Sequence, residues 1–157
     1  MKFKSSSVDE TIALGEKTGQ ELTGGEIITL VGDLGGGKTY FTKGLAKGLL
    51  IREEITSPTF VLERIYETPG GLFLHHFDFY RLIGSDLEIK AEVRELLVDP
   101  TNIIVIEWAT NIPESIPKEN LQIDFSYINE QSRQITLTAH GLKYRKLIER
   151  IKNDFSN

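Results

Sequence analysis

Two apolar runs and two pairs of neighbouring segments predict the strands of this chain. The run 26–31 is rich in β-branched residues and typical of a buried strand, while the continuous run 103–106 predicts a strand buried on both faces. Two segments that flank a turn rich in glycine and proline predict a hairpin, and two later segments in which apolar and polar positions alternate predict a second antiparallel pair. The expected pairs are 60–66 with 72–77, around a turn at 68–71, and 121–127 with 133–139.

Helical spacing of apolar residues predicts four helices between these strands. Residues 7–10 and 85–88 both show the spacing of a capping box, in which a serine cap is followed three residues later by a glutamate. Gly44 and Gly48 lie beside an apolar stripe, and close packing on the sheet would explain them. The expected helices span about 8–21, 40–50, 85–98 and 142–155.

Composition and charge narrow the class of protein. Residues 1–157 fit one compact α/β domain, with 39% hydrophobic and 26% charged residues, and no repeat or linker interrupts them. The absence of cysteine excludes disulfides and thiolate chemistry and favours a reducing cytoplasm. No apolar run approaches the ~20 residues of a membrane span, and the N-terminus lacks the apolar core of a signal peptide. We therefore expect a cytoplasmic protein without membrane contact.

Net charge argues against a protein that grips nucleic acid by itself. The formal charge is −5, whereas proteins that bind DNA or RNA through many phosphates usually present a basic surface. The one basic cluster, within 143–152, is interleaved with apolar residues at helical spacing. A solvated face of an amphipathic helix explains this cluster better than a nucleic-acid site does.

The segment 32–39 carries the clearest chemistry. It reads GDLGGGKT and matches the phosphate-binding pattern G-x-x-x-x-G-K-[ST], with a predicted strand before it and a helix after it. The glycines let several backbone N–H groups converge on one anion. Lys38 can reach the β- and γ-phosphates, and the Thr39 hydroxyl can ligate Mg²⁺. An incidental glycine-rich turn would not need this context, so we expect a P-loop NTPase-like fold with a central parallel-to-mixed sheet, antiparallel additions and flanking helices.

A phosphate loop needs a second oxygen ligand for the metal, usually a carboxylate at the end of a strand. Glu107 directly follows the run 103–106, and Asp78 ends the strand 72–77. Either acid could instead be an exposed or capping residue, and the alternative is weaker for Glu107 because its strand is buried. His75 and His76 are adjacent and face opposite ways on a strand, so they form no two-histidine metal site. Trp108, judged by composition alone, is more often a core residue.

Four motifs in series resemble one known family. They are the phosphate loop at 32–39, TSPTF at 56–60, HFDFYRL at 76–82 and IEW at 106–108. Their order and spacing resemble the bacterial TsaE (YjeE) ATPases of the apparatus that makes N6-threonylcarbamoyladenosine at position 37 of tRNAs reading codons that begin with A. The resemblance covers nearly the whole chain, from the first helix to the strand near residue 133. Gly36 stands where alanine is usual, and Ala109-Thr110 where proline or an acid is common.

The resemblance implies a role for each motif. ATP phosphates would be held by Leu34, Gly35, Gly36, Gly37, Lys38 and Thr39. Thr39 and Glu107 would bind Mg²⁺, while Asp78 would support the metal or the attacking water. Lys38, Asp78 and Glu107 would be the catalytic residues. Residues 57–59 look like the family's switch-like loop, Trp108 like its tryptophan beside the site, and Arg133 like a late basic position that approaches the nucleotide.

The resemblance also implies partners. These would be TsaD-type and TsaB-type proteins, with TsaD carrying the transfer chemistry and tRNA met only indirectly. Two alternatives stay open, a small-molecule or nucleotide kinase and a nucleotide-sensing module that does not hydrolyse ATP. A kinase usually has an arginine-bearing lid over the phosphates, and the sequence shows no such insertion. It also shows no obvious arginine finger in cis, so slow hydrolysis is expected from the chain alone.

Overall fold

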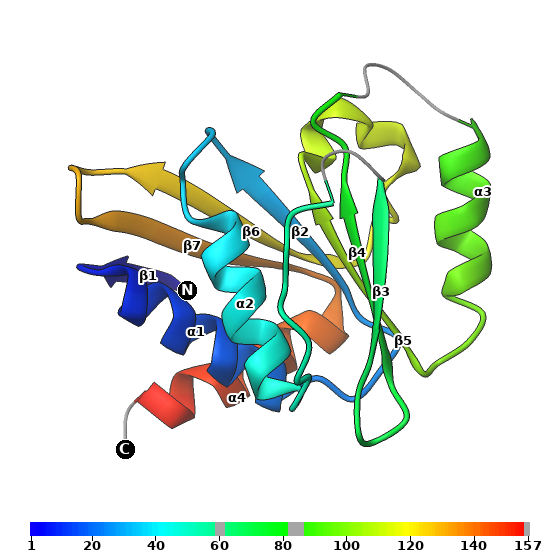
Figure 1. The fold of residues 1–157 in the computed structure, drawn as a ribbon, viewed down its shortest axis with the longest axis horizontal. Coiled ribbons are helices and arrows are strands. Elements are labelled where there is room, and N and C mark those ends of the chain that lie inside the picture. Colours follow the sequence, from blue (N-terminus) through cyan, green and yellow to red (C-terminus); the bar gives the residue numbers. More distant parts are fainter. Residues whose placement is uncertain (59–61, 82–86, 156–157) are drawn as a thin grey trace.

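The computed structural model describes residues 1–58, 62–81 and 87–155, the last range with side chains as far as residue 153. Figure 1 shows its strands in one twisted sheet with helices on both sides. In chain order the strands and α-helices are β1 (Lys2–Ser5), α1 (Val8–Gln20), β2 (Ile27–Gly32), α2 (Lys38–Gly48), β3 (Glu63–Glu67), β4 (Phe73–Asp78), α3 (Leu87–Leu96), β5 (Asn102–Glu107), β6 (Asn120–Tyr127), β7 (Arg133–His140) and α4 (Leu142–Phe155). Two short 3-10 helices, Ala109–Asn111 and Pro113–Ser115, follow β5.

The sheet runs in the order β1-β7-β6-β2-β5-β4-β3. Its centre is parallel, because β2 pairs in parallel with both β5 and β6, and β5 pairs in parallel with β4. Antiparallel strands complete both edges, with β3 on β4, β7 on β6, and β1 on β7. The predicted α/β class with a mixed sheet is confirmed. The carboxyl ends of β2, β4 and β5 meet at one edge, which is where open α/β sheets bind ligands.

Two cores lie on opposite faces of the sheet. Helices α1, α2 and α4 pack on one face, and α3 with the 3-10 helices covers the other. Strand β5 serves both cores, because Ile103 and Val105 belong to the first and Ile104 and Ile106 to the second. The prediction of a strand buried on both faces is therefore confirmed. In the described part of the chain, no helix combines the length and apolar character needed to cross a bilayer.

Glycines bring α1 and α2 into direct backbone contact. A Cβ built on Gly44 would lie 2.0 Å from the carbonyl oxygen of Ile12, and one on Gly48 would lie 2.1 Å from that of Glu16. Gly15 and Gly19 of α1 meet the backbone of α2 in the same way. The expectation that Gly44 and Gly48 pack on the sheet is wrong, because the close approach is made to the neighbouring helix.

The remaining element predictions have mixed outcomes. Ser7 caps α1 as predicted, since its Oγ accepts the Glu10 N–H at 3.1 Å, although the Glu10 carboxylate reaches back to the Ser6 N–H, one residue earlier than expected. Both antiparallel pairs are confirmed. The short edge strand β1 was not predicted. Other expectations fall outside the described residues, namely those on Thr59, Phe60, Leu82, Ser85 and Asp86.

Candidate functional site

The loop between β2 and α2 is shaped by glycine. Gly35 and Gly37 have φ angles of 73° and 107°, a region that residues with a Cβ rarely enter. Gly32, at φ 145°, leaves no room for a side chain, because a Cβ there would lie 2.6 Å from the carbonyl oxygen of Phe125. Gly37 is also the N-cap of α2 and brings no side-chain acceptor. The first N–H groups of a helix lack partners within it, so this loop and the start of α2 form a cradle suited to an anion.

Lys38 lies at the floor of the cradle, with 5% of its surface exposed. Its Nζ donates to the carbonyl oxygens of Gly32 at 2.6 Å and Asp33 at 2.8 Å, and it lies 4.3 Å from the centre of the Trp108 ring. Burial lowers the pKa of Lys38, and the nearby carboxylates of Glu107, Asp78 and Asp33 oppose that shift. The ammonium is thus held close to where phosphate would enter.

Two buried carboxylates face the cradle from the ends of adjacent strands. Asp78 of β4 and Glu107 of β5 are direct partners in the register of the sheet. Asp78 accepts hydrogen bonds of 2.9 Å from the Ser57 hydroxyl and from the Tyr80 N–H. Glu107 lies 2.9 Å from Nε2 of His76. The parallel strands therefore place both predicted acids at the same edge, neither as an exposed end-of-strand residue.

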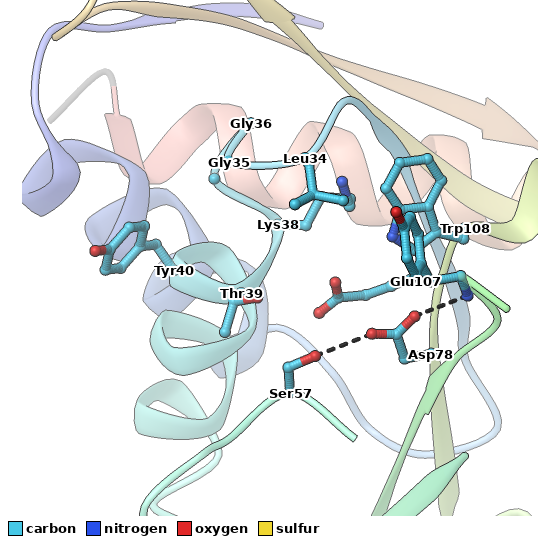
Figure 2. A pocket seen from close by; sticks show the side chains of 12 residues that line it. Leu34, Gly35, Gly36, Lys38, Thr39, Tyr40, Ser57, Asp78, Glu107 and Trp108 are labelled. Atoms are coloured by element: carbon cyan, nitrogen blue, oxygen red, sulfur yellow. Dashed lines mark hydrogen bonds between the residues drawn. The ribbon is translucent and has the colours of Figure 1, made fainter. Parts of the chain in front are cut away.

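A cavity of about 320 Å³ joins the cradle to these carboxylates. Figure 2 shows the Asp78 and Glu107 side chains pointing into it from one side, across from Thr39. Its lining combines eight of the nine residues predicted for the site with Tyr40, Ser57, Tyr80 and Trp108. The eight are Leu34, Gly35, Gly36, Gly37, Lys38, Thr39, Asp78 and Glu107. The cavity is thus the meeting point of segments that are up to 74 residues apart in the chain, counted from Leu34 to Trp108.

Aromatic side chains form one wall of the cavity. Trp108 adopts a left-handed backbone conformation, φ 60°, and its ring centre lies 5.0 Å from that of Tyr80. Trp108 is half-buried and contacts both the core on the α3 side of the sheet and the cavity. Composition alone predicted only the core contact. Sequence reasoning missed Tyr80 in this wall, although it lies within the motif at 76–82. It also did not pair Ser57 with Asp78 or His76 with Glu107.

Arg133 lies on the other side of the phosphate loop. Its guanidinium donates to the carbonyl oxygens of Asn129 and Ser132 and, at 3.4 Å, to that of Gly35. It does not line the cavity of the carboxylates. Instead it lines a second cavity of about 250 Å³, between the loop and the start of α1, which shares Gly35, Gly37 and Tyr40 with the first. Of the nine predicted site residues, Arg133 alone is separated from the rest.

The donor chemistry of the first cavity fits Mg²⁺. Thr39 offers a hydroxyl, and Asp78 and Glu107 offer carboxylates, all of them hard oxygen donors. Among the described residues, no group of three or more His, Cys, Asp or Glu side chains could hold a metal ion by itself. Protein Mg²⁺ sites commonly combine one or two protein oxygens with nucleotide phosphates and water.

Comparisons with known proteins agree on one family. Residues 5–135 match the family model described as "Threonylcarbamoyl adenosine biosynthesis protein TsaE". Proteins named "tRNA threonylcarbamoyladenosine biosynthesis protein TsaE" are similar over most of the chain. The one from Bacillus subtilis strain 168 is 37% identical, covering 96% of this chain and 93% of its own, and the one from Nostoc sp. PCC 7120 is 39% identical, covering 89% and 86%. The crystal structure of YdiB from Bacillus subtilis superposes with a TM-score of 0.84 at 34% identity, covering 98% and 95%.

Proposed function

This chain belongs to the TsaE family, and we propose on that basis that it binds and hydrolyses ATP with Mg²⁺ during formation of N6-threonylcarbamoyladenosine at position 37 of tRNAs reading ANN codons. One observation carries the ATPase part of the proposal. A glycine cradle with a buried lysine faces two buried carboxylates across a single cavity. The glycine cradle and the lysine suit the negative charge of the phosphates. The two carboxylates suit a metal ion and an attacking water.

The residues of the cavity divide the work of hydrolysis between them. The backbone N–H groups of 34–39 and the Lys38 ammonium bind and orient the phosphates. Thr39 and Glu107 hold Mg²⁺, which when bound neutralises phosphate charge. Asp78, fixed by Ser57 and the Tyr80 N–H, orients the attacking water or a water of the metal. The wall formed by Trp108 and Tyr80 restricts solvent beside Lys38.

The second cavity offers a place for the nucleoside. It adjoins the phosphate loop through Gly35 and Gly37, and Ser6, Ser7, Thr11 and Arg133 supply polar groups around it. Arg133 is held in place by carbonyl oxygens of its own turn. A nucleotide whose phosphates occupy the cradle would direct its ribose and base toward this side of the loop. The role of Arg133 in the proposal is therefore contact with the nucleoside.

The same site supports dependence on partner proteins. The described lining of the phosphate cavity contains one cation, Lys38, and no arginine. Arginine fingers raise hydrolysis by roughly 10³–10⁵-fold where they are present, so turnover by the chain alone is proposed to be slow. TsaD-type and TsaB-type proteins, in the cytoplasm, would stimulate it. With a net charge of −5, the chain would meet tRNA through these partners.

Phosphate release from ATP, measured with the purified chain, tests the proposal. Slow release that requires Mg²⁺, rises several-fold or more with TsaD-type and TsaB-type partners, and is accompanied by weak binding of free tRNA at physiological salt would support it. Transfer of the γ-phosphoryl group to a small acceptor would instead identify a kinase. Nucleotide binding without turnover, even with partners, would identify a sensing module. Tight binding of tRNA by the chain alone would refute the indirect contact.

A further inference from the structure

A buried histidine lies directly behind one of the two carboxylates. We propose that His76 is the positioning residue of Glu107: its Nε2–H fixes one carboxylate oxygen so that the other faces the cavity. The inference rests on the proposed function, because it concerns how Glu107 is presented to Mg²⁺. It assigns a role to a histidine that neither the motif chemistry nor the cavity lining calls for.

The sheet places His76 beside Glu107. In β4, His76 and Asp78 point to the same face, and in β5 so do Val105 and Glu107. His76 pairs in register with Val105, and Asp78 with Glu107, so His76 lies diagonally behind Glu107. The side chain of His76 has no exposed surface, and its Nε2 is 2.9 Å from Oε1 of Glu107. His76 is not among the residues that line the cavity, and its hydrogen bond to the lining is the one to this carboxylate.

The other ring nitrogen fixes the direction of the hydrogen bond. Nδ1 of His76 is buried and has no hydrogen-bond partner among the described residues. If Nδ1 carried the proton, its N–H would be a buried donor without a partner. The lone pair of Nε2 would then face the negative carboxylate, and each of these two effects costs free energy. The proton therefore belongs on Nε2, which donates to Glu107. Histidine and carboxylate pairs behind a metal site orient the ligand in this way.

The carboxylate needs this support. A glutamate side chain has three rotatable bonds, and fixing them in one conformation costs conformational entropy. The hydrogen bond from His76 offsets this cost before the metal binds. Among the described residues, His76 is the only hydrogen-bond partner of the Glu107 carboxylate. Loss of such a supporting partner typically reduces metal affinity or activity by about 10–100-fold. We expect an effect in this range on Mg²⁺, without loss of the phosphate cradle.

The neighbouring His75 is a matched control. It is buried, with 5% of its surface exposed against none for His76, but it points to the opposite face, where Nδ1 meets Glu63 at 2.7 Å and Nε2 meets the side-chain oxygen of Asn102 at 3.1 Å. Like His76 it pairs with a carboxylate, that of the partly exposed Glu63, but neither Glu63 nor Asn102 lines the cavity. A structural loss at either histidine should lower stability, whereas only His76 should change the response to Mg²⁺.

Equilibrium binding of a fluorescent ATP analogue, with and without Mg²⁺, separates these roles. In EDTA, His76→Leu should bind the analogue like the parent, because the cradle is untouched. With Mg²⁺, its gain in affinity should fall, and the Mg²⁺ concentration for half-maximal binding should rise about tenfold or more. His76→Gln, whose amide nitrogen can reach the position of Nε2, should restore the parent response, and His76→Asn, whose amide is too short, should not. His75→Leu should leave the response unchanged.

Each outcome bears on one proposal or on both. An unchanged Mg²⁺ response in folded His76→Leu overturns the positioning role alone, and so does an equal change in His75→Leu. If His76→Leu does not fold, equal responses of His76→Gln and His76→Asn overturn it. A parent protein that binds the analogue without any effect of Mg²⁺ refutes the metal part of the proposed function and this inference with it. Rescue by glutamine and not by asparagine supports the role.

Discussion

The phosphate cradle and the carboxylate pair face each other across one cavity but are built in opposite ways. The cradle is a single stretch, residues 32–39, and its shape comes from glycine backbone and the start of α2. The carboxylate pair combines Asp78 and Glu107 from separate strands, and each is held by a side chain from elsewhere, Ser57 in one case and His76 in the other. One half depends on backbone conformation, the other on side-chain partners.

This difference determines which substitutions each half tolerates. A cradle made of N–H groups loses little when a neighbouring side chain changes, but it fails if the backbone moves or its lysine is lost. The position of each carboxylate depends instead on a side-chain hydrogen-bond donor, Ser57 for Asp78 and His76 for Glu107. Both donors lie outside any phosphate-binding motif.

Lys38→Ala is expected to have the largest effect. Hydrolysis should fall by roughly 10²–10³-fold or to the limit of detection, because the buried ammonium is the only cation in the described cavity lining. The fold should survive, since burial lowers the pKa of Lys38 and its charge is costly to the apo protein. Phosphate release and thermal unfolding measure the two effects. Lys47→Ala, on the exposed side of the same helix, is the control. A variant that unfolds, or that hydrolyses ATP like the parent, would show that Lys38 is misassigned.

Glu107→Gln should lower turnover by roughly 10²-fold or more, because the amide keeps the shape but loses the negative oxygen ligand. Asp78→Asn, the matched change on the neighbouring strand, should shift the Mg²⁺ requirement less, because the proposed metal ligands are Thr39 and Glu107. Turnover measured over a Mg²⁺ titration distinguishes the two. Full activity of Glu107→Gln at saturating Mg²⁺ would transfer the metal role to Asp78.

The same contrast explains what the sequence could predict. The residues that form the cradle can be named from the sequence because its determinants are contiguous and glycine has a narrow range of uses there. Asp78 and Glu107 were predicted as acids at strand ends, since parallel strands end at one edge of a sheet. The hydrogen bond between His76 and Glu107 could not be predicted, because it depends on the register of two strands that are 24 residues apart, from Asp78 to Asn102.

Other features of the fold escaped prediction for similar reasons. Strand β1 has four residues and one partly buried apolar side chain, Phe3, which is too little periodicity to indicate a strand. Gly44 and Gly48 were correctly interpreted as sites of close packing, but sequence spacing does not say which element makes the approach. The position of β6 beside β2, in the centre of the sheet, follows from no local pattern.

Gly44→Ala tests the support of the cradle. The added methyl group would meet the Ile12 carbonyl oxygen at 2.0 Å, so α1 and α2 must separate. We expect a loss of about 1–3 kcal/mol in the free energy of unfolding. Nucleotide affinity in EDTA should also weaken, since α2 carries the cradle. Urea unfolding and binding of a fluorescent ATP analogue measure these effects. Gly70→Ala, where the nearest atom is 3.8 Å away, should change neither.

Ser57→Ala should have the smallest effect and tests the other half of the contrast. It removes the 2.9 Å hydrogen bond to Asp78 but leaves the bond from the Tyr80 N–H, so the carboxylate is loosened and not released. One such bond contributes about 1 kcal/mol, which corresponds to a fall in turnover of about fivefold. Ser57→Thr keeps the hydroxyl and should behave like the parent in the same phosphate-release assay.

Combining Ser57→Ala with Asp78→Asn shows whether the two residues act together. If Ser57 acts only through Asp78, the double variant should be no slower than Asp78→Asn alone. In Asp78→Asn the carboxylate that the Ser57 hydroxyl holds is already gone, so losing the hydroxyl should have no further effect. Additive losses would mean that Ser57 also acts by a route other than its hydrogen bond to Asp78, and the carboxylate half of the site would then depend on Ser57 in a second way.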